Sequence, residues 1–77
     1  MRTGIVISYN STIRCGFIQD GNKQKIRFFN ENPDLIFKRL DVVRFSIGFI
    51  DHALRAINIS PALDANGSRV SLAININ

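Results

Sequence analysis

Short segments rich in β-branched and aromatic residues, separated by turn residues and with no convincing helix between them, limit the folds that are open to this chain. Segments of this length and composition are typical of β-strands. They cover residues 3–9, 13–19, 23–29, 42–49 and 53–59. The series predicts an all-β fold, and it favours a closed barrel because closure removes the exposed edges of a flat sheet.

Turn residues arrange the first three segments as a meander. Asn10-Ser11-Thr12 follows the first segment, and Asp20-Gly21-Asn22, the stronger turn signal, follows the second. Residues 30–41 contain Asn32-Pro33-Asp34 and apolar residues without a clean period. This stretch indicates a long loop with room for one helical turn.

The last part of the chain breaks the strand pattern and then restores it. Ser60-Pro61 ends the fifth segment, so residues 1–60 are predicted to form one domain and residues 61–77 a linker and an additional C-terminal strand. The apolar residues of that strand alternate with small or polar ones; they are Val70, Leu72, Ile74 and Ile76. We expect the strand to pair with a barrel edge and cover Ile5, Ile7 or Ile13, within one molecule or by exchange in a homodimer. A frayed terminus is the alternative.

The composition fits one small globular domain with an anionic partner. The chain has 77 residues, of which 45% are hydrophobic and 21% charged. Its 10 Lys+Arg against 6 Asp+Glu give a net charge of +4, which favours nucleic acid as a partner. The sequence has a single cysteine and no apolar run that approaches membrane-spanning length. We therefore expect a cytoplasmic protein without an internal disulfide and without membrane association.

Residues that carry catalysis or bind metals in other proteins are sparse here. Cys15 and His52 are the only residues of their types, and they lie far apart in the sequence without a recognisable third group. Glycine-rich phosphate loops and nucleotide fingerprints are absent from the sequence. We therefore expect no enzymatic activity, no metal and no cofactor. Cys15 is interpreted as a small apolar filler, with an exposed thiol as the further reading.

Four stretches, in the same order and at matching distances, resemble motifs of the cold-shock domain. G-I-V-I-S-Y-N at 4–10 resembles the family's opening G-x-V-K-W-F-N, and I-R-C-G-F-I at 13–18 resembles its first nucleic-acid motif, K-G-F-G-F-I. Residues 24–30 lie where the second motif, V-F-V-H-F, is expected, and A-I-N-I at 56–59 resembles the closing A-x-N-V. The resemblance covers roughly residues 1–59. It implies a five-stranded OB-fold barrel that binds single-stranded RNA or DNA with low sequence specificity, as a cold-shock-like chaperone or regulator.

The resemblance also implies a binding surface on the second and third strands, where alternate side chains project rings on which bases stack. Phe17 matches a stacking ring, Phe29 stands at the place of a histidine, and Arg27 at the place of a phenylalanine. Gly16 matches the small residue that keeps the strand surface open, and Phe37 either extends the surface or anchors its loop. The predicted nucleic-acid-binding residues are Arg14, Gly16, Phe17, Lys25, Arg27, Phe29 and Phe37.

The chain departs from the family on this surface. Ser8 replaces a tryptophan and Cys15 a phenylalanine, while Ile7 and Ile13 replace lysines. Arg14 replaces a glycine and returns one charge. The sequence therefore predicts a reduced surface with lower affinity than that of a typical member. It leaves open an alternative in which the barrel is a protein-interaction or self-association module with an apolar docking surface.

Overall fold

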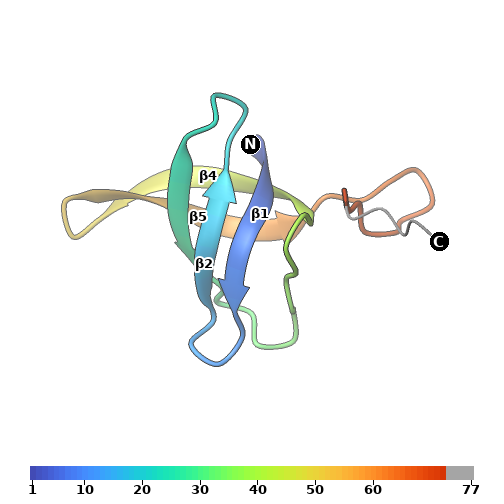
Figure 1. Ribbon diagram of the computed structural model, residues 1–77, viewed down its shortest axis with the longest axis horizontal. Coiled ribbons are helices and arrows are strands. Elements are labelled where there is room, and N and C mark those ends of the chain that lie inside the picture. The colour runs from blue at the N-terminus through green and yellow to red at the C-terminus, as the bar shows by residue number, and fades with distance from the viewer. Residues whose placement is uncertain (73–77) are drawn as a thin grey trace.

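The computed structural model describes residues 1–72, which form an all-β fold without a helix. Its strands are β1 (Arg2–Asn10), β2 (Cys15–Gln19), β3 (Lys25–Phe29), β4 (Val42–Ile50) and β5 (Ala53–Pro61). They close into a barrel in the order β1-β2-β3-β5-β4 (Figure 1). The five-stranded barrel predicted from the sequence is therefore confirmed, and its strand order is consistent with an OB-like barrel.

A bulge in β1 lets this strand pair with two neighbours. β1 runs antiparallel to β4 through its first half and to β2 through its second half, and the register to β2 shifts between Val6 and Ser8. At the shift, Val6 donates to the Asp41 carbonyl at 2.9 Å and accepts from the Leu40 N–H at 2.7 Å. A bulge of this kind bends the strand and increases its twist, which helps a small barrel to close.

The core follows the two-residue alternation of the strands. Buried apolar side chains fill the barrel; they are Val6, Ile18, Ile26, Phe28, Phe37, Val43, Phe45 and Ala56. β3 shows the alternation most plainly, because Ile26 and Phe28 are buried while the residues on either side of them are exposed. These two side chains therefore point into the barrel, and Arg27 and Phe29 point outward.

Side-chain caps hold the two turns of the meander. Asn10 Oδ1 accepts a hydrogen bond from the Thr12 N–H at 2.9 Å. Asp20 Oδ1 accepts from the N–H groups of Asn22 and Gln24 at 2.9 and 2.8 Å. Such bonds from a side chain to the backbone two to four residues on are the reason that Asn and Asp are frequent in turns. The two turns predicted between the first three strands are thus confirmed.

The long loop between β3 and β4 contains no helical turn, and two of its residues fix it to the barrel. Asn30 is buried and donates from Nδ2 to Tyr9 Oη at 3.0 Å and to the Leu35 carbonyl at 2.7 Å. The ring of Phe37 enters the core cluster. The loop lies at the lower end of the barrel in Figure 1 and is held there by these contacts.

The chain after β5 returns to the start of β4. The Val42 N–H donates to the Val70 carbonyl, and the Val70 N–H donates to the Ala62 carbonyl, both at 3.0 Å. Two residues later, the Leu72 N–H donates to the Leu40 carbonyl at 2.8 Å. The segment projects on the side of the barrel opposite to the β4–β5 hairpin (Figure 1). Residues 62–72 are therefore hydrogen-bonded to the barrel through their backbone.

The additional C-terminal strand predicted from the sequence is not seen within the described residues. Between Arg69 and Leu72 the chain makes isolated bridges, of which one joins Ser71 to Asp41. Leu72 does line a shallow pocket together with Ile5, one of the residues that the tail was expected to cover. Positions 74 and 76 lie outside the described residues. That the apolar residues of the predicted C-terminal strand cover the barrel, and that two molecules exchange this strand in a dimer, stay predictions.

Candidate functional site

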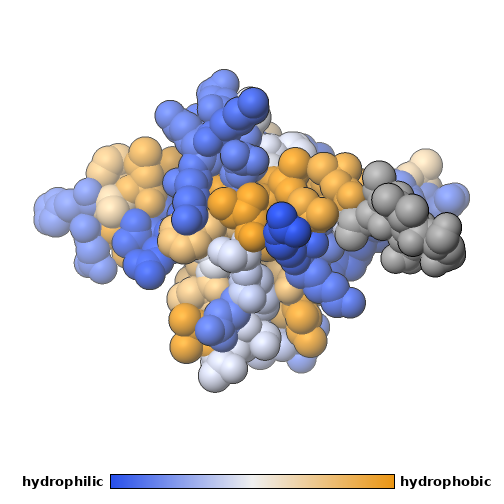
Figure 2. Space-filling model, viewed as in Figure 1, coloured by the Kyte–Doolittle hydropathy of each residue, from blue (hydrophilic) through white to orange (hydrophobic). Residues whose placement is uncertain are grey.

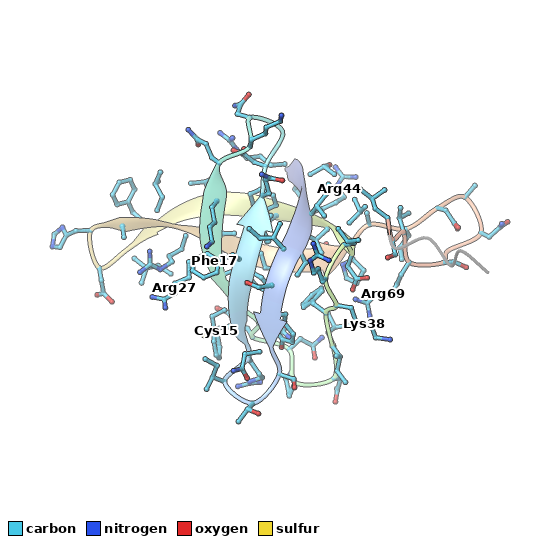
Figure 3. The ribbon with its side chains drawn as sticks, in the orientation of Figure 1. Cys15, Phe17, Arg27, Lys38, Arg44 and Arg69 are labelled. Carbon is cyan, nitrogen blue, oxygen red and sulfur yellow. The ribbon has the colours of Figure 1, made fainter. Side chains whose placement is uncertain are left out.

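The outer side of β2 and β3 carries most of the side chains that the sequence pointed to. Because neighbouring residues of a strand point to opposite sides, the outward residues of these strands form one surface, called here the β2–β3 face. Its members are Cys15, Phe17, Gln19, Lys25, Arg27 and Phe29. Figure 3 shows Cys15, Phe17 and Arg27 on this side of the barrel. The face holds two rings and two cations and no carboxylate, so its charge is positive.

Phe17 lies at the centre of the face, under two cations. Its ring is half-buried and lies opposite Arg27 in the strand pairing. Lys25 Nζ is 4.2 Å from the ring centroid, and the Arg27 guanidinium carbon is 5.9 Å from it. A cation over an aromatic face at an exposed site stabilises by about 0.5–1 kcal/mol. The contact is therefore weak enough for a ligand to displace.

Phe29 forms the second ring of the face and has its own cation. The side chain is 46% exposed, and the Arg14 guanidinium carbon lies 5.1 Å from the ring centroid. Arg14 reaches this ring because it ends the β1–β2 turn with a φ of 56° and its carbonyl accepts a hydrogen bond from the Asn30 N–H at 2.7 Å. The turn and the end of β3 are thus held together, and Arg14 joins the face from outside β2.

The β1 side of the face is a shallow hollow. Ser8 lies opposite Phe17, and Asn10 lies opposite Cys15. A depression of about 260 Å³ is lined by these four residues together with Tyr9, Ile13, Gly16 and Arg27. Ser8 stands where the resemblance places a tryptophan, and its small side chain leaves this room beside Phe17.

Phe37 does not belong to the face, which corrects one of the predicted binding residues. Its side chain is 2% exposed and packs edge-on against Tyr9 at 5.7 Å and Phe28 at 5.8 Å between ring centroids. The ring anchors the loop in the apolar core, where Leu35 of the same loop also packs, while Ile36 between them stays exposed. The alternative reading, a loop anchor, is therefore the one that holds.

Gly16 also lies elsewhere than expected. It is buried and shares its side of β2 with Ile18, so a Cβ there would point inward, 2.2 Å from the Ser8 carbonyl oxygen and 2.9 Å from the Phe28 ring. The glycine therefore allows β1 and β2 to approach each other over the core. The absent side chain would have pointed into the barrel and not over the outer surface, although the backbone of Gly16 lines the hollow beside Phe17. Contact of Gly16 with a ligand stays a prediction.

The β4–β5 hairpin carries an apolar surface that was not among the sites predicted from the sequence. Phe49 is 73% exposed and lies opposite Leu54, which is 52% exposed, while Ile50 is 48% exposed. Apolar side chains gather on this hairpin at the left of the view in Figure 2. The signal was present in the sequence, because apolar residues flank the Asp51-His52 turn on both strands.

Other kinds of site find little support in residues 1–72. Cys15 lies in β2 and His52 at the tip of the hairpin, and no group of three or more His, Cys, Asp or Glu side chains in this part of the chain is placed to hold a metal ion. None of the described residues forms a helix that is long and apolar enough to cross a membrane. Comparisons of the chain with protein-family models, with curated proteins and with solved structures give no match.

Proposed function

We propose that the β2–β3 face binds single-stranded RNA or DNA with low sequence specificity. One observation carries the proposal: two phenyl rings project from adjacent strands of a closed barrel, and each has a cation over it. Every base has a π-face, so stacking on such rings tolerates any sequence. Lysine and arginine beside the rings suit the phosphates that link the stacked bases.

The cation–ring contacts suggest how binding proceeds. Lys25 and Arg14 cover the rings in the free protein. A base that arrives on Phe17 or Phe29 takes the place of the cation, and the freed cation then lies next to the phosphate of the same nucleotide. The cation–ring interaction that the base displaces stabilises by about 0.5–1 kcal/mol, whereas stacking contributes about 1–3 kcal/mol per base. The exchange is therefore favourable.

The resemblance to the cold-shock domain supports a role as a nucleic-acid chaperone or regulator. Ser8 and Cys15 replace two of the family's rings, so fewer bases stack than on a complete surface. We propose a binder of lower affinity than a typical member, which suits transient contact with many sequences.

Fluorescence anisotropy of labelled oligo-U and oligo-dT tests the proposal against a duplex of equal length. Single strands should bind more tightly than the duplex, because stacking needs unpaired bases. Phe17→Ala should weaken single-strand binding by about 1–3 kcal/mol while the far-UV spectrum stays unchanged. Leu54→Ala, which truncates an exposed apolar residue of the hairpin, is the matched control and should bind as the parent does. Equal affinity of Phe17→Ala and the parent would remove the ring from the site.

A second candidate function is favoured by the hairpin. Phe49 and Leu54 present apolar area to solvent on one side of a projecting hairpin, and exposed apolar patches mark protein contacts. On this alternative the barrel self-associates through the hairpin. Light scattering across a concentration series distinguishes the two candidates: a mass that rises with concentration and falls again in Phe49→Ser supports self-association. A constant monomer mass argues against it.

A further inference from the structure

The pairing of β3 with β5 is the shortest in the barrel. The two strands pair in parallel at Phe28 and Ala56, and the β4–β5 hairpin leaves the barrel beside this point (Figure 1). A pocket of about 340 Å³ lies there. It is lined from β2 and β3 by Cys15, Arg27, Phe28 and Phe29, and from the hairpin by Ile50 and Arg55.

This pocket is continuous with the β2–β3 face. Cys15, Arg27 and Phe29 belong to both, and the side chain of Arg27 extends from β3 toward the side from which the hairpin projects (Figure 3). A single-stranded nucleic acid that lies across the face therefore reaches the pocket directly. Neither Ile50 nor Arg55 was among the residues predicted to bind.

The charge of the pocket calls for an anion. Two arginines, Arg27 and Arg55, line it, and no carboxylate does. The guanidinium of Arg55 stays close to its own strand, β5, because its Nη1 donates to the Leu54 carbonyl at 3.0 Å. Within residues 1–72 neither guanidinium forms an ion pair with a carboxylate. Guanidinium groups bind phosphate oxygens through paired hydrogen bonds, so a phosphate complements this arrangement.

The shape and lining of the pocket suit a base. Its volume of about 340 Å³ lies at the lower end of the range of about 300–1,000 Å³ typical of small-ligand sites. Phe29, 46% exposed, and Ile50, 48% exposed, supply a ring and an aliphatic side chain. Unstacked bases bind proteins by packing on rings and apolar side chains in this way.

We propose that the pocket holds one unpaired nucleotide of the strand bound on the β2–β3 face, with its base against Phe29 and Ile50 and its phosphate on Arg27 and Arg55. This inference rests on the proposed function, and it extends the path of the strand from β2 and β3 onto the hairpin. Arg55 is the residue on which it depends most, because Arg27 and Phe29 also serve the face itself.

The first test measures oligo-U affinity in the full chain, with an oligomer of about 12 nucleotides, within the site sizes of OB folds. Arg55→Gln should weaken binding about tenfold, as expected when one charge-assisted hydrogen bond is removed, and should reduce the salt slope by about 0.7. Arg44→Gln makes the same charge change on the other side of the barrel from Arg27 (Figure 3), and it should weaken binding much less.

The second test reports on the pocket without changing its charge. In a Cys15→Ser background, Ile50→Cys and Leu54→Cys introduce thiols at positions of similar exposure, 48% and 52%. Leu54 lines a different pocket, so it is the matched control. Saturating oligo-U should slow alkylation several-fold in Ile50→Cys and leave Leu54→Cys unchanged.

The outcomes separate this inference from the proposed function. If oligo-U binds the parent and Phe17→Ala weakens it, while Arg55→Gln and Ile50→Cys behave as their controls do, the pocket stays empty and the inference is wrong although the proposed function stands. If oligo-U does not bind the parent, both are wrong. If poly-glutamate slows alkylation of Ile50→Cys and oligo-U does not, the pocket binds an acidic peptide and not a nucleotide, and the inference is wrong.

Discussion

Phe28 and Phe29 are neighbours in the chain and lie in opposite surroundings. Phe28 is fully buried, and its ring stacks on Tyr9 with 5.8 Å between centroids. Phe29 is 46% exposed beneath Arg14. Because successive strand residues point to opposite sides, truncating one ring should act on stability and truncating the other on binding.

Phe28→Ala is expected to lower the free energy of unfolding by about 3–5 kcal/mol, the usual loss for a buried ring. Phe29→Ala should change stability far less and should weaken oligonucleotide binding by about 1–3 kcal/mol. Urea titration followed by tyrosine fluorescence measures the first quantity, and anisotropy measures the second. A stable Phe28→Ala variant, or Phe29→Ala that binds as the parent does, would contradict this division of the two rings.

Gly16 should tolerate no side chain. The Cβ of Gly16→Ala would lie 2.2 Å from the Ser8 carbonyl oxygen, so β1 and β2 must move apart at a loss of about 1–3 kcal/mol or more. Gly21→Ala is the control, because a Cβ there meets nothing within 4 Å. Thermal unfolding of both variants checks this, and equal melting temperatures would mean that the strands at Gly16 separate without loss.

The residues of the face could be predicted where a strand period existed. Phe17 and Phe29 lie at alternate positions with other outward residues of their strands, so the side of the sheet on which they lie followed from the alternation. Gly16 lies two residues before the buried Ile18 and on the same side of β2, so the sequence did contain a signal for its inward position. Phe37 lies in a loop, where no period says which way a side chain points, so its burial had to come from the structure.

Among the elements, the segment after β5 contacts the loop between β3 and β4 through the side chain of Arg69. Arg69 Nη2 lies 3.1 Å from Asp41 Oδ2, and its guanidinium carbon lies 5.4 Å from the Phe37 ring centroid. The same Asp41 oxygen accepts from the Lys38 N–H at 2.8 Å. Arg69 therefore joins the C-terminal segment to the loop between β3 and β4.

Arg69→Gln should lower the free energy of unfolding by about 1 kcal/mol, since the arginine is 40% exposed and partly screened ion pairs contribute little more. The difference from the parent should shrink in high salt, because ions screen the pair. Arg39→Gln removes a neighbouring exposed arginine that makes no ion pair among the described residues. Denaturation of both variants at low and high salt measures the effect, and an Arg69→Gln curve equal to that of Arg39→Gln would show that the ion pair does not stabilise the fold.

The strands themselves followed from the sequence, and their observed ends fall within two residues of the predicted ones. Apolar alternation and turn residues are local signals, and they sufficed for β1 to β5. The backbone hydrogen bond between Val42 and Val70 could not be predicted in the same way. It depends on which backbone groups near Leu40 remain unpaired after the barrel closes, and no local sequence pattern indicates which these are.

Across the molecule, the net charge is +4. The β2–β3 face and the adjoining pocket hold cations and no carboxylate, so this surface attracts an anionic polymer.

Oligo-U affinity should fall with salt to a moderate degree. We expect two to four phosphate contacts, and at about −0.7 per phosphate on a single strand the slope of log affinity against log salt should be about −1.4 to −2.8. Anisotropy titrations over a salt series give this slope. Binding that ignores salt would favour an apolar docking surface, which screening affects little.

An NMR titration of the full chain with oligo-U, in which the backbone amide chemical shifts are followed, tests directly whether the β2–β3 face binds nucleic acid. We predict saturable shifts that are largest in Cys15–Gln19 and Lys25–Phe29, follow one binding curve and leave residues 62–72 almost unchanged. Phe17→Ala should shift the same amides at higher oligonucleotide concentration. If the chemical shifts of the β2 and β3 amides do not change at saturating oligo-U, whether or not the shifts of other amides change, this face does not bind nucleic acid.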